Sequence, residues 1–315
     1  MRETPSIRPL PPALLFCALA AAGCGSGAAT RTTGSPTTAA TTSTASPRRA
    51  TPPALCRGDR PRELGRVGDP AMDELSGLVR GRRDRHVLFA LEDSGAPPVI
   101  TALRPDGTLL GHTTVAGATA TDWEDIAAGP GPGGQASLFA ADIGDNGAAR
   151  DRVQVYRLDE PAAAVTSAAP AARLDLRYPD GAHDAEALLA DPFRHELLVV
   201  TKALLRGRVY TVASTLADGT RTTLRKGPAV ALGPVTAGDV SADGRVVALR
   251  TYSTLALWRR HGREPLARTL GRAPTCIAPA DLSAEGQGEA LALSPDGGTA
   301  ITAPEGADAV LRRYG

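Results

Sequence analysis

Three glutamates at equivalent places in an internal repeat are the residues best placed to do chemistry. An acid followed by a short apolar run occurs at Glu124, Glu186 and Glu289, and each copy is followed by a second apolar run. Two degenerate copies carry a hydroxyl at the equivalent position, Ser76 and Thr236. These anchors recur about every 50 residues, a period typical of β-propellers. Because the first strand of each blade lines the channel of a propeller, we expect these five side chains to form one ring around its axis.

The chemistry of such a ring follows from its charge. Two carboxylates about 5 Å apart repel each other by ~3 kcal/mol at an effective dielectric near 20, so they need a proton, an arginine or a cation. The ring offers only oxygen ligands, which favours Ca²⁺ over Zn²⁺. We therefore predict a calcium ion bound by Ser76, Glu124, Glu186, Thr236 and Glu289. The alternative is that the acids pair with buried arginines or begin strands in solvent.

A second set of polar residues is expected at the ends of the second strands, facing the same channel. The acids would lie on one side and Lys202 and Arg250 on the other. The set consists of Glu92, Asp93, the segment from Asp142 to Asn146, Lys202, Arg250 and Glu305. Such a group could hold a metal-bound anion such as a phosphate. The alternative for Asp142 and Asn146 is turn chemistry, because Asp and Asn favour strand-end turns. Lys202 is a stronger candidate for anion binding, because lysine is rare in this sequence. The only other lysine is Lys226, and the remaining Lys+Arg positions are all arginines.

Motifs of other enzyme classes are absent from the sequence. There is no serine-hydrolase elbow, zinc-protease motif, phosphate-binding glycine loop or twelve-residue calcium loop. The histidines are scattered, and only His183, beside Asp184, is a candidate proton carrier, with a solvated loop histidine as the alternative. The lack of an evident nucleophile–base pair favours binding over catalysis.

The repeat resembles known families. Ser-Gly-Leu-Val at 76–79, Trp-Glu-Asp-Ile-Ala at 123–127, Ala-Glu-Ala-Leu at 185–188 and Gly-Glu-Ala-Leu-Ala at 288–292 resemble the YjiK-like, SdiA-regulated bacterial surface propellers and the propellers with phytase-esterase-like activity. The order of acids and hydroxyls is similar to that of the five-bladed calcium-activated nucleotidases. The resemblance implies a propeller with an axial Ca²⁺, and either a binding or scaffold role or a calcium-dependent hydrolysis of phosphoesters or esters.

Short strands must position these residues. The first repeat contains four apolar runs, at 76–79, 87–91, 99–103 and 109–115, and Asp-Gly turns recur along the chain. We expect the outer strands of the third and fourth repeats at 221–224 and 266–270. The fifth repeat is one strand short, and the run at 62–67 can supply it. The sequence therefore predicts an all-β, five-bladed propeller closed by its N- and C-terminal strands, with six blades as the alternative.

The N-terminal part is expected to lie outside this fold. An apolar run at 13–22 ends in Ala-Ala-Gly-Cys, which is typical of an export signal and resembles a bacterial lipobox with Cys24 as the lipidated residue. A secretory peptide cut near Gly27 is the alternative. Residues 25–55 are rich in Thr, Ser and Ala and lack large apolar side chains, which favours a disordered tether. We thus expect a signal peptide at 1–24, a tether at 25–55 and a propeller domain at 56–315.

The charge and cysteine content of the sequence limit the classes of partner and the cellular compartment that we expect. A net charge of +1 and the lack of a basic stripe argue against nucleic acid. Cys56 and Cys276 remain outside the signal, and two lone cysteines in an oxidising compartment usually pair. We therefore expect a monomeric, disulfide-bonded protein anchored outside the cytoplasm to the cell membrane, or secreted, that binds a small molecule or a surface partner.

Overall fold

The computed structural model describes residues 53–58, 60–93 and 95–315. The predicted signal peptide, the lipidation at Cys24 and nearly all of the predicted tether lie outside the described residues. In the described part of the chain, no helix is long and apolar enough to cross a membrane.

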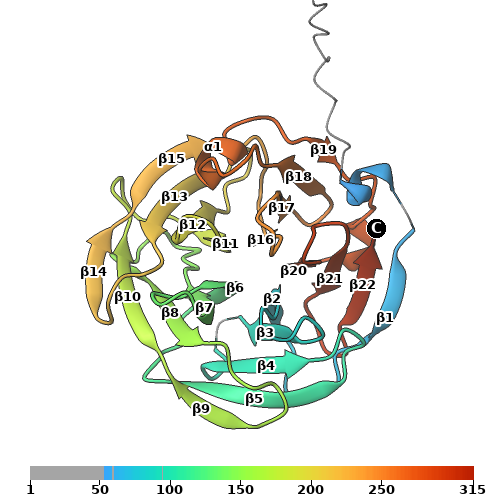
Figure 1. The fold of residues 1–315 in the computed structure, drawn as a ribbon, viewed down its shortest axis with the longest axis horizontal. Helices are drawn as coiled ribbons and strands as arrows, with labels where there is room; N and C mark the ends of the chain where they lie inside the picture. Colours follow the sequence, from blue (N-terminus) through green and yellow to red (C-terminus); the bar gives the residue numbers. More distant parts are fainter. Residues whose placement is uncertain (1–52, 59, 94) are drawn as a thin grey trace, which may run out of the picture. The chain divides into compact units, whose positions relative to one another are not determined.

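Five β-sheets surround a central axis (Figure 1). The innermost strands are β2 (Leu75–Arg80), β6 (Trp123–Pro130), β11 (Ala185–Asp191), β16 (Ala237–Val240) and β20 (Gly288–Leu293). Each innermost strand contacts the innermost strands of both neighbouring sheets, so the sheets close into a ring. The five-bladed β-propeller predicted from the repeat is confirmed.

The first two blades each gain a strand from the blade that follows. Blade 1 continues from β2 through β3 (Leu88–Glu92), β4 (Val99–Leu103) and β5 (Leu109–Ala116), and blade 2 from β6 through β7 (Ala136–Asp142), β8 (Val153–Asp159) and β10 (Ala172–Arg177). Strand β9 (Ser167–Pro170) pairs in parallel with β5, and β14 (Thr220–Thr223) pairs in parallel with β10. The prediction that 221–224 forms the outer strand of blade 3 is therefore wrong.

Blades 3 and 4 take their outer strands from other segments. Blade 3 consists of β11, β12 (Glu196–Thr201), β13 (Arg208–Ala213) and β15 (Arg225–Ala229), and blade 4 of β16, β17 (Val246–Arg250), β18 (Leu255–Arg259) and β19 (Cys276–Ile277). The predicted strand at 266–270 is instead a helix, α1 (Leu266–Leu270). Leu266 and Leu270, one helical turn apart, are both fully buried, and this spacing suits a helix rather than a strand.

Blade 5 closes the ring with both ends of the domain. It consists of β20, β21 (Ala300–Pro304), β22 (Val310–Tyr314) and β1 (Arg62–Arg66), with β1 antiparallel to β22. Two short 3₁₀ helices complete the described elements, η1 (Ala54–Arg57) and η2 (Ser283–Glu285). The prediction that the solitary N-terminal strand completes the fifth blade is confirmed.

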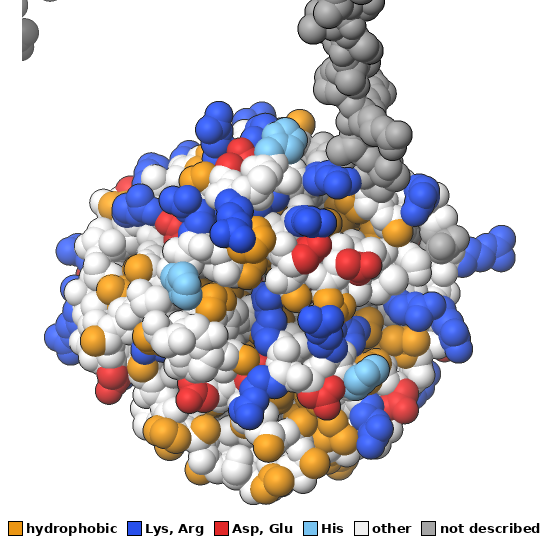
Figure 2. Space-filling view, viewed as in Figure 1, with side chains coloured by type: hydrophobic (Ala, Val, Ile, Leu, Met, Phe, Trp, Pro, Cys, Tyr) orange, Lys and Arg blue, Asp and Glu red, His pale blue; other side chains and the backbone are white. Residues whose placement is uncertain are grey.

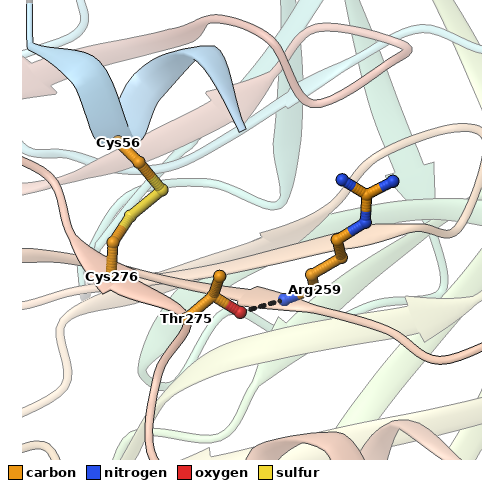
Figure 3. Close-up of a disulfide and its surroundings, with 4 residues drawn as sticks. All are labelled: Cys56, Arg259, Thr275 and Cys276. Carbon is orange, nitrogen blue, oxygen red and sulfur yellow. Dashed lines mark hydrogen bonds between the residues drawn. A yellow bond between two sulfur atoms is a disulfide. The ribbon is translucent and has the colours of Figure 1, made fainter. Parts of the chain in front are cut away.

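The predicted disulfide is also confirmed. Cys56 at the end of η1 is bonded to Cys276 in β19, with the two Cα atoms 5.8 Å apart (Figure 3). Beside it, the Thr275 hydroxyl accepts a hydrogen bond of 2.8 Å from the backbone N–H of Arg259. The bond spans 220 residues, so the chain-entropy model gives it about 5 kcal/mol of stabilisation. Such a bond is typical of proteins outside the reducing cytoplasm.

Apolar side chains between neighbouring blades form the core. The strands β2, β6, β11 and β20 are buried almost throughout, because each is covered by the next strand of its own blade and by the two neighbouring blades. Polar groups on these strands therefore need partners inside the protein or at the channel ends. The outer surface is more polar, and Figure 2 shows Lys and Arg side chains gathered near the centre of one face of the domain.

Candidate cation site at the channel mouth

Bulges at the starts of the innermost strands place the predicted ring residues. The strand register skips one residue at Ser76, at Glu124, at Glu186 and at Glu289, and a bulge turns the extra side chain out of the ladder. Thr236 directly precedes β16. All five residues are at most 3% exposed. We call the end of the channel at these bulges the mouth.

The two hydroxyls of the ring make contacts between blades. Ser76 Oγ donates a hydrogen bond of 2.5 Å to the backbone carbonyl of Glu124. Thr236 Oγ1 donates one of 2.9 Å to the backbone carbonyl of Gly288. Each hydroxyl thereby joins the start of its own innermost strand to that of the next blade. Their protons are used within the protein, which leaves only oxygen lone pairs for any ligand.

The carboxylates of the mouth form a cluster that extends beyond the predicted ring of five residues. One oxygen from each of Asp93, Asp122 and Glu124 lies within 4.8 Å of the other two, and the same holds for Glu124, Asp184 and Glu186. Glu124 is common to both sets. Asp122 and Asp184 each stand two residues before a ring glutamate, and this shared Asp-x-Glu spacing was a signal in the sequence.

Glu186 is only half satisfied. Its Oε1 contacts the ammonium of Lys202, whereas its Oε2 is buried and has no hydrogen-bond partner among the described residues. Burial, followed by the charge of Glu289, raises the pKa of Glu186 to about 8, although Lys202 opposes the shift. A buried acceptor without a donor is uncommon and needs an explanation. This oxygen is therefore available to bind a cation or a proton.

The other glutamates of the mouth lie mainly among carboxylates rather than cationic groups. Burial and then the charges of Glu186 and the nearby aspartates raise the pKa of Glu124 to about 11. Glu289 accepts a hydrogen bond of 3.2 Å from the Tyr252 hydroxyl and shares another with Glu305, whose pKa burial and this contact raise to about 8. Burial and like charges therefore favour the protonated forms of Glu124 and Glu305 unless a cation enters.

A glycine leaves room for the acid cluster. A Cβ atom added at Gly144 would lie 2.2 Å from Glu124 Oε1 and 2.5 Å from Asp122 Oδ2. The loop of Gly144 is fixed beside the acids, because its neighbour Asp145 donates a backbone hydrogen bond of 2.9 Å to Asp184. The loop after β7 thus forms one wall of the cluster, and a side chain at this position would displace the carboxylates of Glu124 and Asp122.

The predicted anion-binding residues have different environments. Lys202 lies at the mouth, on Glu186 and 5.6 Å from the centre of the Tyr252 ring. Arg250 is fully buried and pairs with Glu285 at 3.0 Å, a partner from η2 that sequence spacing did not reveal. Asp142 is fully buried and pairs with Arg150 at 2.8 Å, and Asn146 is exposed on the following loop. The structure therefore brings only Lys202 of these four to the ring glutamates.

His183 belongs to a separate polar group. Its Nε2 lies 2.8 Å from the Tyr210 hydroxyl and 3.2 Å from Asp180. Asp180 also pairs with Lys226 at 2.6 Å. The imidazole nitrogen that could carry a proton is thus engaged away from the ring glutamates, although Asp184 is the next residue in the chain.

Arg82 links three blades at the end opposite the mouth. This residue, in the β2–β3 connection of blade 1, donates 2.8 Å and 3.1 Å hydrogen bonds to backbone carbonyls of Ala128 in blade 2 and Ala242 in blade 4. Its backbone N–H donates to Glu160 at 2.8 Å. The acid cluster lies at the mouth, whereas at the opposite end this guanidinium holds blades 1, 2 and 4 together.

No protein-family profile matches the sequence, and no curated protein matches it. Similar solved structures include a Bacteroides uniformis protein assigned as a 6-phosphogluconolactonase (14% identity, 76% of this chain and 65% of that chain, TM-score 0.40). Others are a nidogen–laminin complex (14%, 73% and 72%, TM-score 0.43) and the Dos1 propeller (11%, 76% and 67%, TM-score 0.38). The chain thus spans less than two thirds of the first of these. Similarities at this level say nothing about function.

Proposed function

We propose that this protein is a β-propeller binding domain whose mouth holds one divalent cation, Ca²⁺, and presents it to a ligand. The observation that carries the proposal is Glu186 Oε2, a buried carboxylate oxygen without a partner among the described residues, in a cluster with Glu124 and Asp184. The donors are all oxygen, as Ca²⁺ prefers. Glu124, Asp184 and Glu186 would hold the ion, and Asp93 and Asp122 would add charge beside it.

Thermal melting of the purified protein tests this proposal. Calcium that binds only the folded state at a hundredfold excess over Kd should stabilise it by about 2.7 kcal/mol. The melting temperature should therefore rise with calcium and fall with a chelator. Magnesium should act more weakly, because it demands a tighter octahedral site. A melting temperature indifferent to both calcium and chelator would reject the cation site.

Calcium-dependent hydrolysis of phosphoesters or esters is the second candidate function. The observation that favours it is the position of Lys202, whose ammonium contacts Glu186 and could hold an anion when a cation takes over that carboxylate. The bound ion would supply Lewis-acid chemistry. Hydrolysis of nitrophenyl phosphate and nitrophenyl acetate with calcium, lost in Lys202→Met, would support this function. Calcium binding without any turnover would leave the binding role.

We also propose that the protein is anchored to the outer side of the cell membrane through Cys24. The disulfide of the domain supports a location outside the cytoplasm, and the lipobox-like sequence before Cys24 supports lipidation. A clickable fatty acid should label the wild type in cells and not Cys24→Ser. Equal labelling of the two would indicate secretion without an anchor.

A further inference from the structure

A second pocket lies away from the mouth, at the boundary of blades 1 and 2. Its volume is about 440 Å³, within the range of small-molecule sites. It lies beneath the segment that leaves β8 of blade 2 and continues into β9 on the edge of blade 1. The β2–β3 connection also lines it. Since β2 starts at the mouth and ends at this connection, the pocket is at the opposite end of the blades from the acid cluster.

The floor of this pocket is apolar. Val87, Phe89 and Leu110 line it, and Phe89 is 1% exposed. Leu110 and Ala163 pack against the hydrophobic core between the two blades. The covering segment lies close to β5 because that strand has a glycine there, and a Cβ at Gly111 would lie 3.0 Å from the Ala163 carbonyl. The pocket can therefore take an apolar body.

Cationic side chains stand at the same pocket. Arg83 and Arg104 both line it, together with His86. The exposed Arg104 guanidinium interacts electrostatically with the nearby Asp106 carboxylate but makes no hydrogen bond or ion pair with it or with any other described residue, whereas Arg83 donates to the Glu160 carbonyl at 2.9 Å. The Glu160 carboxylate already accepts the backbone N–H groups of Arg82 and Arg83 at 2.8 Å and 3.0 Å. Its charge is thus stabilised within the protein, as is that of Asp84, the other acid of the lining, which accepts the backbone N–H of His86 at 2.9 Å. The exposed Arg104 can therefore meet an anion.

We propose that this pocket binds a small, largely apolar molecule that carries one anionic group, such as an aromatic or aliphatic carboxylate or sulfonate. The apolar body lies on Val87, Phe89 and Leu110, and the anionic group meets Arg104. A charge-assisted bond to an arginine fixes the orientation of such a ligand. This site is independent of the cation at the mouth and of the function proposed there.

Fluorescence titration with 8-anilinonaphthalene-1-sulfonate, an aromatic sulfonate, tests this inference on the purified protein. We expect one saturable site that is unchanged by calcium or chelator. Arg104→Gln should weaken binding about tenfold, which corresponds to ~1.4 kcal/mol. The control is Arg85→Gln, an exposed arginine of the β2–β3 connection that does not line the pocket, and it should bind as the wild type does.

Two further measurements test the pocket without the Arg104 variant: a pocket-filling variant and an uncharged ligand. Ala163→Phe, which fills the pocket from its cover, should abolish the saturable phase while the melting temperature stays that of a folded protein. The uncharged analogue N-phenyl-1-naphthylamine should bind at least tenfold more weakly than the sulfonate. Equal weakening by Arg104→Gln and Arg85→Gln, full binding to Ala163→Phe, or equal affinity for the uncharged analogue would each overturn the proposal.

Discussion

The mouth and the interior of the ring treat buried acids in opposite ways, and the contrast begins at two adjacent residues. In the interior, Asp125 accepts backbone hydrogen bonds of 2.8 Å from Ile126 on one oxygen and from Leu188 of the next blade on the other. Burial raises the pKa of both Asp125 and its neighbour Glu124 at the mouth. The backbone donors oppose this rise at Asp125, whereas the charges of other carboxylates add to it at Glu124, whose pKa is raised to about 11. Asp125 thus has a hydrogen-bond donor for each carboxylate oxygen, whereas Glu124 would be stabilised by a cation.

Blade 4 repeats the interior arrangement. Asp239 accepts 2.7 Å hydrogen bonds from the backbone of Val240 and, across to blade 5, of Leu293. Asp125 and Asp239 therefore join blade 2 to blade 3 and blade 4 to blade 5. Fixed backbone dipoles satisfy these acids when the chain folds. At the mouth, Glu186 Oε2 has no such donor among the described residues, so the comparison separates acids that hold the ring together from acids that bind a ligand.

The largest expected effect comes from the interior. Asp125→Ala leaves two buried N–H groups without acceptors, and each such loss costs about 1–3 kcal/mol. We expect the free energy of unfolding to fall by ~3 kcal/mol in urea denaturation, equally with calcium and with chelator. A variant that instead lost its calcium response at unchanged basal stability would place Asp125 in the cation site and break the comparison.

Glu186→Gln should have the next largest effect, and only when calcium is present. The amide still offers an oxygen to Lys202 but removes a charge from the cluster, so the calcium-free form should melt no lower than the wild type. The calcium-induced stabilisation, about 2.7 kcal/mol at a hundredfold excess over Kd, should be largely lost. Glu196→Gln on the same blade, whose carboxylate pairs with Arg225, should keep the full calcium response.

The pH dependence should differ with and without calcium. The pKa values of Glu186 and Glu305 are raised to about 8 in the folded protein, so without calcium their stabilising contribution is complete below pH ~4.5 and is lost as the pH rises through 8. Calcium needs the ionised carboxylates. Its affinity should therefore increase from pH 6 to pH 8, about tenfold per pH unit for each proton displaced. An affinity independent of pH in calorimetry would contradict the raised pKa values.

Gly144→Ala should give the smallest effect. The added Cβ would displace Glu124 or Asp122, which should weaken calcium binding by about fivefold, or ~1 kcal/mol. Gly147→Ala in the same loop is the matched control, because a Cβ there meets nothing within 4 Å. Equal calcium affinities of the two variants would show that the space left by Gly144 is not needed for calcium binding.

Much of the fold could be predicted because the repeat carries both the hydrophobic period and the inner-strand acids. The starts of β2, β6, β11, β16 and β20 follow from it, as does closure by β1. The errors concern the edges, where propensity competes with long-range pairing. The run at 220–223 does form a strand, but its partner β10 belongs to another blade, and a single run carries no record of its partner.

The site could be predicted in part for a similar reason. Ring positions follow from the repeat, and the end of the second strand in blade 1 indicates Asp93. The approach of Asp93 to Glu124, however, depends on the packing of blade 1 against blade 2. The burial of Arg250 depends on Glu285, 35 residues away in the chain. Such contacts arise from the closed ring, and local sequence patterns do not contain them.

Calorimetric titration of the purified protein with calcium at pH 7.5, in two buffers with different ionisation enthalpies, tests the central claim most directly. The account predicts one ion per chain and a buffer-dependent heat that reports net proton release, because glutamates with raised pKa values must ionise to bind it. Glu186→Gln should lower the affinity and the number of protons released. No binding, or binding without proton release that Glu186→Gln leaves unchanged, would contradict the account.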